Sequence, residues 1–241
     1  MPMPRTVIPP RMLPGMAEAA ACALLRLLSW LSPAFPVGAF AYSHGIETAV
    51  DTGLIRGAAD LEGWIGAIAT RGAGFTDAVL VCHAWRAAAS GDSEGLRRVQ
   101  SYAAAFRGSA EAALESSAQG RAFRAALAAG WPELAVQSED GTEPAYACVV
   151  GAAAGVGGIP LADTAVAFLH AFSANLVSAG VRLVPLGQRD GVRILAALAP
   201  VIARAAAAAL GTGLDDLGTA TARVDWTMAR HETQHVRLFR S

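Results

Sequence analysis

The sequence predicts an all-α protein, folded as a single-domain bundle of about ten helices. Apolar residues recur at spacings of three and four from residue 17 onward, which is typical of amphipathic helices. No run of β-branched residues alternates convincingly with polar ones, as strands would require. The 241 residues are 54% hydrophobic, and no linker of changed composition divides them. We therefore expect one domain over residues 1–241.

Prolines and glycines separate the first helices. Residues 1–16 are expected to form a flexible N-terminal extension, ahead of a first helix that ends before Pro33. A second helix ends near Gly53, because glycine adopts the left-handed conformation that often follows a helix. A third helix opens near Asp60 and covers DLEGWIGAIATRG.

Three further features complete the first half. A fourth helix runs through FTDAVLVCHAWRAAAS, and Asp92 or Ser93 caps a fifth. Residues 109–129 form a sixth helix, which Gly130 and Pro132 end. The polar run QSEDGTEP is expected to be a loop inside the domain, because helical patterns resume directly after it.

The second half predicts four helices. A helix rich in small residues covers 145–157, and a long helix runs from Pro160 to about Leu183. Another follows from about Asp190 to Leu210. Asp215 or Asp216 is expected to cap the last helix, which carries the C-terminal motif discussed below.

The charged residues argue against several functions. The chain has 19 basic and 20 acidic residues, so it lacks the positive charge typical of nucleic-acid or anionic-membrane binding. All of the basic residues are arginines. The absence of lysine excludes Schiff-base chemistry, a lysine general base and a Walker A phosphate site.

Cysteines and apolar runs favour a soluble, cytoplasmic protein. The three cysteines lie far apart, as reduced core thiols do: Cys22, Cys82 and Cys148. The stretch AAACALLRLLSWL imitates a signal peptide, but Arg26 interrupts it. The later run ILAALAPVIARAAAAAL contains Pro200 and Arg204, and the run AYACVVGAAAGVGGIP is short and rich in glycine. We therefore expect no membrane span.

The C-terminal run His231-Glu232-Thr233-Gln234-His235 has the H-E-x-x-H spacing of a zinc protease. On a helix, two imidazoles one turn apart bind zinc while the glutamate polarises a metal-bound water. A third protein ligand is needed, and six residues follow His235. A zinc metalloprotease is therefore one hypothesis, but a weakly supported one.

The same run allows a second interpretation, a terminal helix with two distinct faces. One face is an apolar stripe at spacings of three and four: Val224, Met228, His231, His235 and Leu238. The other is a basic ridge at a spacing of seven: Arg223, Arg230 and Arg237. This helix either binds a partner or packs on the domain's own core.

Three other patterns favour structure over chemistry. Glycines crowd the run GAAAGVGGIP, but no strand precedes it and no lysine follows, so close helix packing is preferred to a phosphate site. Neighbours such as Cys82 and His83 diverge by about 100° on a helix and cannot easily share a metal. His44 and Glu47 share a helix face, as a hydrogen-bonded pair or an ordinary contact.

Three longer segments carry a resemblance. They are LSPAFPVGAFAYSHGIETAVDTGLI, FSANLVSAGVRLVPLGQRDGVRIL and MARHETQHVRLFRS. In their order and spacing they closely resemble the urease accessory protein UreF family over nearly the whole chain. That family usually has Tyr where this chain has His235, so the resemblance implies that H-E-x-x-H is a coincidence and that the chain is not an enzyme.

The resemblance implies an all-α, homodimeric chaperone subunit of urease maturation in the cytoplasm. Such a subunit bridges the GTPase UreG and the scaffold UreD, also called UreH, for GTP-dependent nickel insertion into the urease apoprotein. It implies no stably bound cofactor, because the partners handle nickel and GTP. The alternative is a regulator of the GTPase, either an activator that supplies an arginine or a fidelity checkpoint.

The matching segments also supply candidate residues for partner contacts. The six candidates from Arg230 to Arg240 belong to a partner-binding tail at about residues 225–241. We expect this tail to be mobile without its partner, because little holds it. Pro185 and Gly187 are expected to be structural turn residues. The candidates are Tyr42, Glu47, Arg182, Gln188, Arg230, His231, Glu232, Arg237, Leu238 and Arg240. An internal hydrogen bond between helices is the competing role for each polar one.

Overall fold

The computed structural model describes residues 14–135 and 143–241, and in these ranges it contains helices and no strand. This confirms the all-α prediction. The elements up to residue 134 are α1 (Pro14–Trp30), the 3-10 helix η1 (Ala39–Ala41), α2 (Ile46–Asp51), α3 (Ala58–Arg71), α4 (Ala73–Ser90), α5 (Ser93–Ala105), α6 (Ala110–Gly130) and η2 (Pro132–Leu134). The others are α7 (Tyr146–Val156), α8 (Leu161–Leu183), α9 (Gln188–Gly211), η3 (Leu214–Asp216) and α10 (Ala222–His231).

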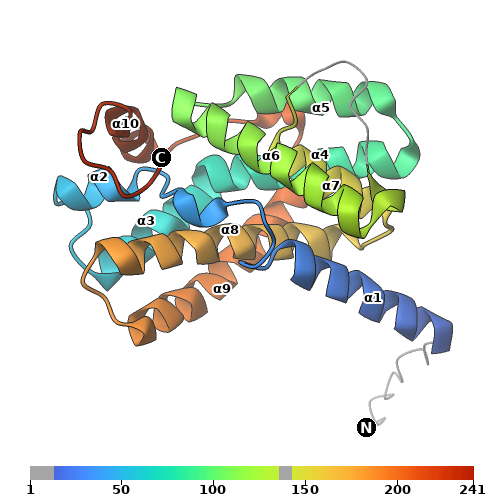
Figure 1. Ribbon diagram of the computed structural model, residues 1–241, viewed down its shortest axis with the longest axis horizontal. Coiled ribbons are helices and arrows are strands. Elements are labelled where there is room, and N and C mark those ends of the chain that lie inside the picture. The colour runs from blue at the N-terminus through green and yellow to red at the C-terminus, as the bar shows by residue number, and fades with distance from the viewer. Residues whose placement is uncertain (1–13, 136–142) are drawn as a thin grey trace, which may run out of the picture.

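Helix α4 lies at the centre of the bundle and contacts α3, α5, α7, α8 and α9 (Figure 1). One side of α4 contributes Val79 and Cys82 to a core shared with α2, α3, α8, α9 and α10. Its other side contributes Leu80 and Val81 to a core shared with the end of α1 and with α5, α6 and α7. Two apolar clusters thus meet along one buried helix.

The glycine-rich helix α7 packs directly against α4. A Cβ atom on Gly151 would lie 2.3 Å from the carbonyl oxygen of Val81, and one on Gly155 would lie 2.4 Å from that of Trp85. Such distances are possible only without side chains, so the two backbones approach each other closely. This confirms the packing interpretation of these glycines.

Most predicted caps and breaks are confirmed. Asp92 is the N-cap of α5, as predicted, and accepts a hydrogen bond from the backbone N of Gly95. Ser109, the first residue of the predicted sixth helix, caps α6 in the same way. Gly53 has a φ of 72° just after α2. Most of the predicted loop QSEDGTEP lies outside the described residues.

Other predicted boundaries are wrong. Helix α1 already begins at Pro14, so it includes the end of the expected extension, and residues 1–13 lie outside the described residues. Asp215 and Asp216 do not cap the last helix, because they form η3, and α10 begins after Thr221. Cys22 is exposed, whereas Cys82 and Cys148 are buried as expected.

Among the residues that the structure describes, three segments are long and apolar enough to cross a membrane by length and composition: Ala58–Ser90, Leu161–Leu183 and Gln188–Gly211. The expectation that Pro200 and Arg204 shorten the last of these is wrong, because α9 continues through both residues. Its proline lies on an exposed position, where the missing N–H group is less disruptive.

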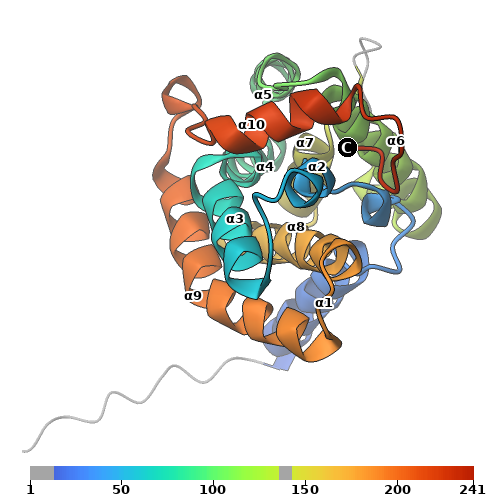
Figure 2. The same ribbon diagram turned by 90° about the vertical axis from the view of Figure 1, so that its left-hand side faces the viewer.

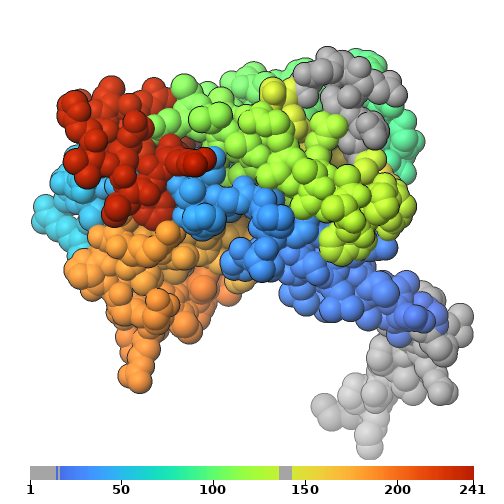
Figure 3. Space-filling model, viewed as in Figure 1, coloured from blue at the N-terminus to red at the C-terminus, as the bar shows by residue number. Residues whose placement is uncertain are grey.

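The two ends of the described chain are placed differently. Helix α1 projects from the body of the molecule, and α10 lies beside α2 on the opposite side (Figures 1 and 2). After α10 the chain turns back across the surface and meets the segment that precedes α2 (Figure 3).

Candidate functional site

The three segments that resemble one family come together at one place on the surface. The backbone N of Ser43 donates to the carbonyl oxygen of Ser241 at 2.7 Å, and the backbone N of Arg240 donates to that of Ala41 at 2.8 Å. From α8, Nη2 of Arg182 donates to the carbonyl oxygen of Phe40 at 2.9 Å. The Arg182 guanidinium also lies 4.5 Å from the centre of the Phe239 ring.

We name residues 232–241 the C-terminal segment. Side chains near its end alternate in burial: Phe239 and Ser241 are buried, while Leu238 and Arg240 are exposed. The inward residues attach the segment to the bundle, and the outward residues form its free face. The structure therefore differs from the expectation of a loosely held tail.

Glu47 is the main acceptor for this segment. The residue is only 4% exposed. Its two carboxylate oxygens accept hydrogen bonds from the backbone N atoms of Leu238 at 2.7 Å and Phe239 at 3.0 Å. Buried carboxylates need such donors, because desolvation of an unpaired charge is costly. Glu47 is therefore an internal anchor in this structure, which favours the competing role of an internal hydrogen bond over a contact with a partner at the surface.

His231 is fully buried between two carboxylates. Its Nδ1 lies 2.7 Å from Oε2 of Glu111, and its Nε2 lies 3.2 Å from Oε2 of Glu47. His231 is therefore an internal link between α10, α6 and α2, which again favours the internal role over a partner contact.

The zinc-protease hypothesis fails on geometry. Helix α10 ends at His231, so Glu232 and His235 are not on the helix that the motif requires. His235 is exposed, whereas both nitrogens of His231 already face carboxylates. Within the described ranges, no group of three His, Cys, Asp or Glu side chains could hold a metal ion. Because α10 ends at His231, the apolar stripe and the basic ridge predicted for this helix do not continue to residues 237 and 238.

Two further candidates attach the C-terminal segment to α6. Oε1 of Glu232 accepts from the backbone N of Ala110 at 2.8 Å, at the first turn of α6, where a negative charge is stabilised. Nη1 of Arg237 lies 2.6 Å from Oε1 of Glu111, so this arginine forms an ion pair within the chain. Both side chains are exposed, and both already have partners.

The remaining candidates are divided between the core and the surface. Tyr42 is 3% exposed, so its side chain belongs to the core of the folded chain. Gln188 is exposed at the first residue of α9. Arg230 is exposed and lies 6.0 Å from the Trp226 ring. The free face of the C-terminal segment includes Leu238, which is 78% exposed, and Arg240.

Sequence reasoning missed the role of α6. His44 and Glu47 do not form the expected pair; instead Nε2 of His44 lies 3.0 Å from Oε1 of Glu115. Oε2 of Glu115 accepts from the hydroxyl of Ser241 at 3.1 Å. Glu111 and Glu115 are four residues apart and share a helix face, a weak signal that does not identify partners more than 70 positions away.

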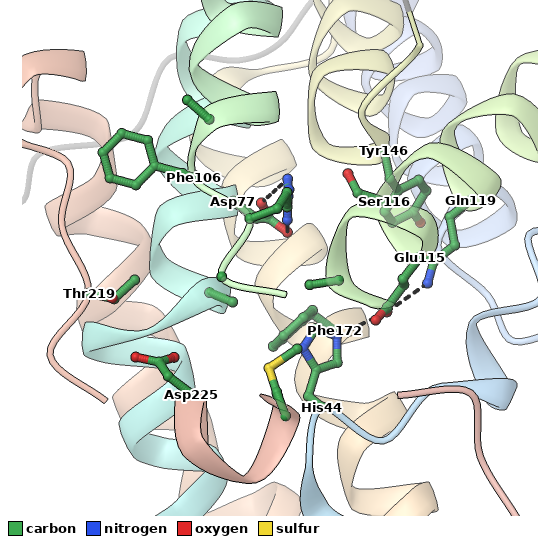
Figure 4. A pocket seen from close by; sticks show the side chains of 16 residues that line it. His44, Asp77, Phe106, Glu115, Ser116, Gln119, Tyr146, Phe172, Thr219 and Asp225 are labelled. Atoms are coloured by element: carbon green, nitrogen blue, oxygen red, sulfur yellow. Dashed lines mark hydrogen bonds and ion pairs between the residues drawn. The ribbon is translucent and has the colours of Figure 1, made fainter. Parts of the chain in front are cut away.

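A cavity of about 310 Å³ lies beside this network (Figure 4). Arg107 and Asp77 line it as a buried ion pair, with 2.8 Å between Nη2 and Oδ1. Asp225 lines it from α10, and desolvation raises the pKa of this carboxyl despite a hydrogen bond from Thr221. Burial also raises the pKa of the Cys148 thiol to about 12, so this cysteine is not an activated nucleophile.

Comparison with known proteins confirms the family resemblance of the sequence. The UreF family model matches residues 55–199. A urease accessory protein UreF from Rhodopseudomonas palustris strain TIE-1 is 50% identical over 232 residues, which cover 95% of each chain. The chain belongs to the UreF family. It is an accessory-protein family of urease maturation and not the urease enzyme itself.

Other UreF proteins match over similar lengths. One from Bradyrhizobium sp. strain BTAi1 is 48% identical over 237 residues, covering 96% of this chain and 98% of the relative. One from Xanthobacter autotrophicus is 49% identical over 231 residues, covering 94% and 95%. These matches extend beyond the residues of the family model, so the likeness to UreF proteins covers nearly the whole chain.

Proposed function

We propose that this chain is the subunit of a urease maturation complex that bridges the GTPase UreG and the scaffold UreD, also called UreH. In this role it supports GTP-dependent nickel insertion into the urease apoprotein and performs no catalysis itself. It acts as a cytoplasmic homodimer without a stably bound cofactor. Membership of the UreF family supports the general role. The absence of lysine supports the proposal that a partner, and not this chain, binds GTP.

The observation that carries this proposal is an apolar surface beside the C-terminal segment. Phe40, Val236 and Leu238 are 67%, 80% and 78% exposed, respectively. Contacts of Arg182 with Phe40 and Phe239, and of Arg240 with Ala41, keep the two parts of this surface together. Large exposed apolar side chains beside arginines are typical of binding hot spots, because burial gives affinity and each guanidinium finds an acceptor.

We assign this surface to the scaffold. The backbone of the C-terminal segment is held by bonds to Glu47 and Ser43, and the Ser241 hydroxyl donates to Glu115, so binding requires little ordering of the chain. The exposed arginines Arg182, Arg237 and Arg240 favour a partner that presents carboxylates around an apolar centre. Arg237 already pairs with Glu111, so it contributes less than Arg240.

The test is co-expression with UreD, UreG and urease, followed by size-exclusion chromatography and nickel analysis of the urease. Leu238→Asp and Phe40→Asp are expected to reduce scaffold binding at least about tenfold while helicity is unchanged, because each places a charge in the apolar contact. The matched control is Val166→Asp, an exposed valine on α8, 16 residues before Arg182 and so about 24 Å along the helix. Scaffold binding that survives both aspartates would contradict this assignment.

A further inference from the structure

His44 combines a strained backbone with a buried side chain. Of the non-glycine residues in ranges 14–135 and 143–241, His44 alone has a positive φ, of 50°. This conformation is unfavourable for a side-chain-bearing residue, and it persists when surrounding contacts maintain it. The residue is 6% exposed, and Phe172 packs against the imidazole edge-on with 4.9 Å between ring centres.

The neighbours of His44 receive the C-terminal part of the chain. Both the backbone N and the hydroxyl of Ser43 donate to the carbonyl oxygen of Ser241. On the other side, Gly45 lies so close to Thr227 of α10 that a Cβ atom would be 2.5 Å from the hydroxyl oxygen. Residues 43–45 therefore form a cradle for α10 and the C-terminal segment.

Glu115 connects His44 to the same segment. One carboxylate oxygen lies 3.0 Å from Nε2 of His44 and also accepts from Nε2 of Gln119 at 2.9 Å. The other oxygen accepts from the Ser241 hydroxyl. Glu115 is 6% exposed, so its negative charge depends on these partners.

The charges around His44 come from several elements. Asp77 of α4, Arg107 before α6 and Glu115 of α6 act on the imidazole, and Tyr146 and Asp225 line the same cavity from α7 and α10. Burial lowers the pKa of His44, but the charge and hydrogen bond of Glu115 outweigh it, with help from Asp77 and against Arg107. The pKa of His44 therefore lies above its ordinary value.

We propose that protonated His44 closes a clasp on the C-terminal segment through Glu115 and Ser241, and that loss of the proton favours release of the segment. A neutral imidazole still donates one hydrogen bond to Glu115 but no longer balances its buried charge. The clasp is a property of this chain by itself and does not depend on the partner proposed above. Through the clasp, the position of the surface that contains Leu238 depends on pH.

The direction of the response follows from linkage. Because the pKa of His44 is raised in the closed form, the stabilisation is fully present below about pH 6.5, the ordinary value of the imidazole. It decreases as the pH rises from there through the raised pKa. In that window the ratio of open to closed segment increases about tenfold per pH unit, because opening releases one proton.

Hydrogen–deuterium exchange of the purified full chain tests the proposal. Protection factors, corrected for the intrinsic pH dependence of exchange, are measured for the amides of Ser43 and Arg240, whose bonds break on opening. We expect both to fall with rising pH above about 6.5, by up to about tenfold per unit, while amides within α4 do not change.

His44→Asn identifies the group responsible, because asparagine tolerates a positive φ but does not titrate. Both amides should then have low protection at every pH. His83→Asn is the matched control: this histidine of α4 bonds instead to the carbonyl oxygen of Thr212, so its pH profile should equal that of the wild type. A wild type without pH dependence, or an unchanged profile in His44→Asn, would overturn the proposal.

Glu115→Gln is a second, independent variant in case His44→Asn does not fold. Glutamine has the size of glutamate and keeps an acceptor for the Ser241 hydroxyl, but it carries no charge. The pH response should disappear in this variant as well. Retention of the wild-type profile would overturn the role assigned to Glu115.

Discussion

Helix α1 and the C-terminal segment with α10 are attached to the bundle in opposite ways. Helix α1 is mostly apolar, yet Leu24, Leu25 and Leu28 are at least half exposed. Of the α1 side chains that the structure describes, only Leu27 and Trp30 are buried. Helix α10 and the segment after it carry more charge, but Glu47, Glu111 and Glu115 hold them at several points.

This difference shows that apolar character alone does not decide which part of a chain is covered. An apolar helix remains exposed when its neighbours offer no surface against it, as for most of α1. A polar segment is held when buried acceptors match its backbone N–H groups and its imidazole. The acceptors are directional, so they also determine which side chains of the segment face outward.

The largest expected effect concerns the attachment of α1. Trp30 is fully buried and packs edge-on against Phe123 and Trp131. Trp30→Ala should therefore destabilise the protein by about 3–5 kcal/mol in urea unfolding. Leu25→Ala, at a 60% exposed position on the same helix, should change stability by less than about 0.5 kcal/mol. Equal losses for both variants would mean that α1 is covered along its length.

The next effect concerns the cradle. In Gly45→Ala, the added methyl group meets a left-handed backbone and lies too close to Thr227 Oγ1 and the backbone N of Met228. We expect this variant to lose about 2–4 kcal/mol of unfolding free energy. Gly38 has the same φ of 73°, and no atom lies within 4 Å of the position that an alanine methyl group would take. Gly38→Ala therefore isolates the backbone strain, at about 1 kcal/mol. Urea unfolding compares the two, and similar losses would show that the contact with α10 contributes nothing.

A smaller, local effect is expected for the main acceptor. Glu47→Gln keeps an oxygen but removes the charge that binds two backbone N–H groups and His231. We expect the C-terminal segment to lose about 2–3 kcal/mol of docking energy, and trypsin cleavage after Arg237 to accelerate at least about tenfold. Glu133→Gln, at an exposed glutamate that faces Arg26, should cleave like the wild type. Slow cleavage in Glu47→Gln would show that the other contacts suffice.

The smallest effect is expected at His235. This residue is exposed and lies outside α10, so His235→Tyr should change stability by less than about 0.5 kcal/mol and leave urease activation unaltered. Nickel and zinc analysis of the purified protein should give the same result for both forms. Loss of activation together with loss of a stoichiometric metal would restore the metal hypothesis. The C-terminal segment would then contain a metal site and would not be held by the buried carboxylates alone.

Local patterns in the sequence were sufficient for the helices. Spacings of three and four, the cap at Asp92, and the breaks at Pro185 and Gly187 depend on residues within a few positions of each other. For the same reason, the glycines of α7 could be interpreted as a packing surface before their partner, α4, was known. Errors arose where neighbouring signals competed, as in the aspartates of η3 and the proline within α9.

The roles of the polar residues were decided by the tertiary structure. Glu47 follows a chain break like a surface residue, and His231 lies on an apolar stripe that could have met a partner. Both become internal because α2, α6 and α10 converge on them. His44 pairs with Glu115, 71 positions away, and not with the nearby Glu47. Local spacing carries no information about such contacts, because a buried charge is stabilised by whatever donors the folded chain brings to it.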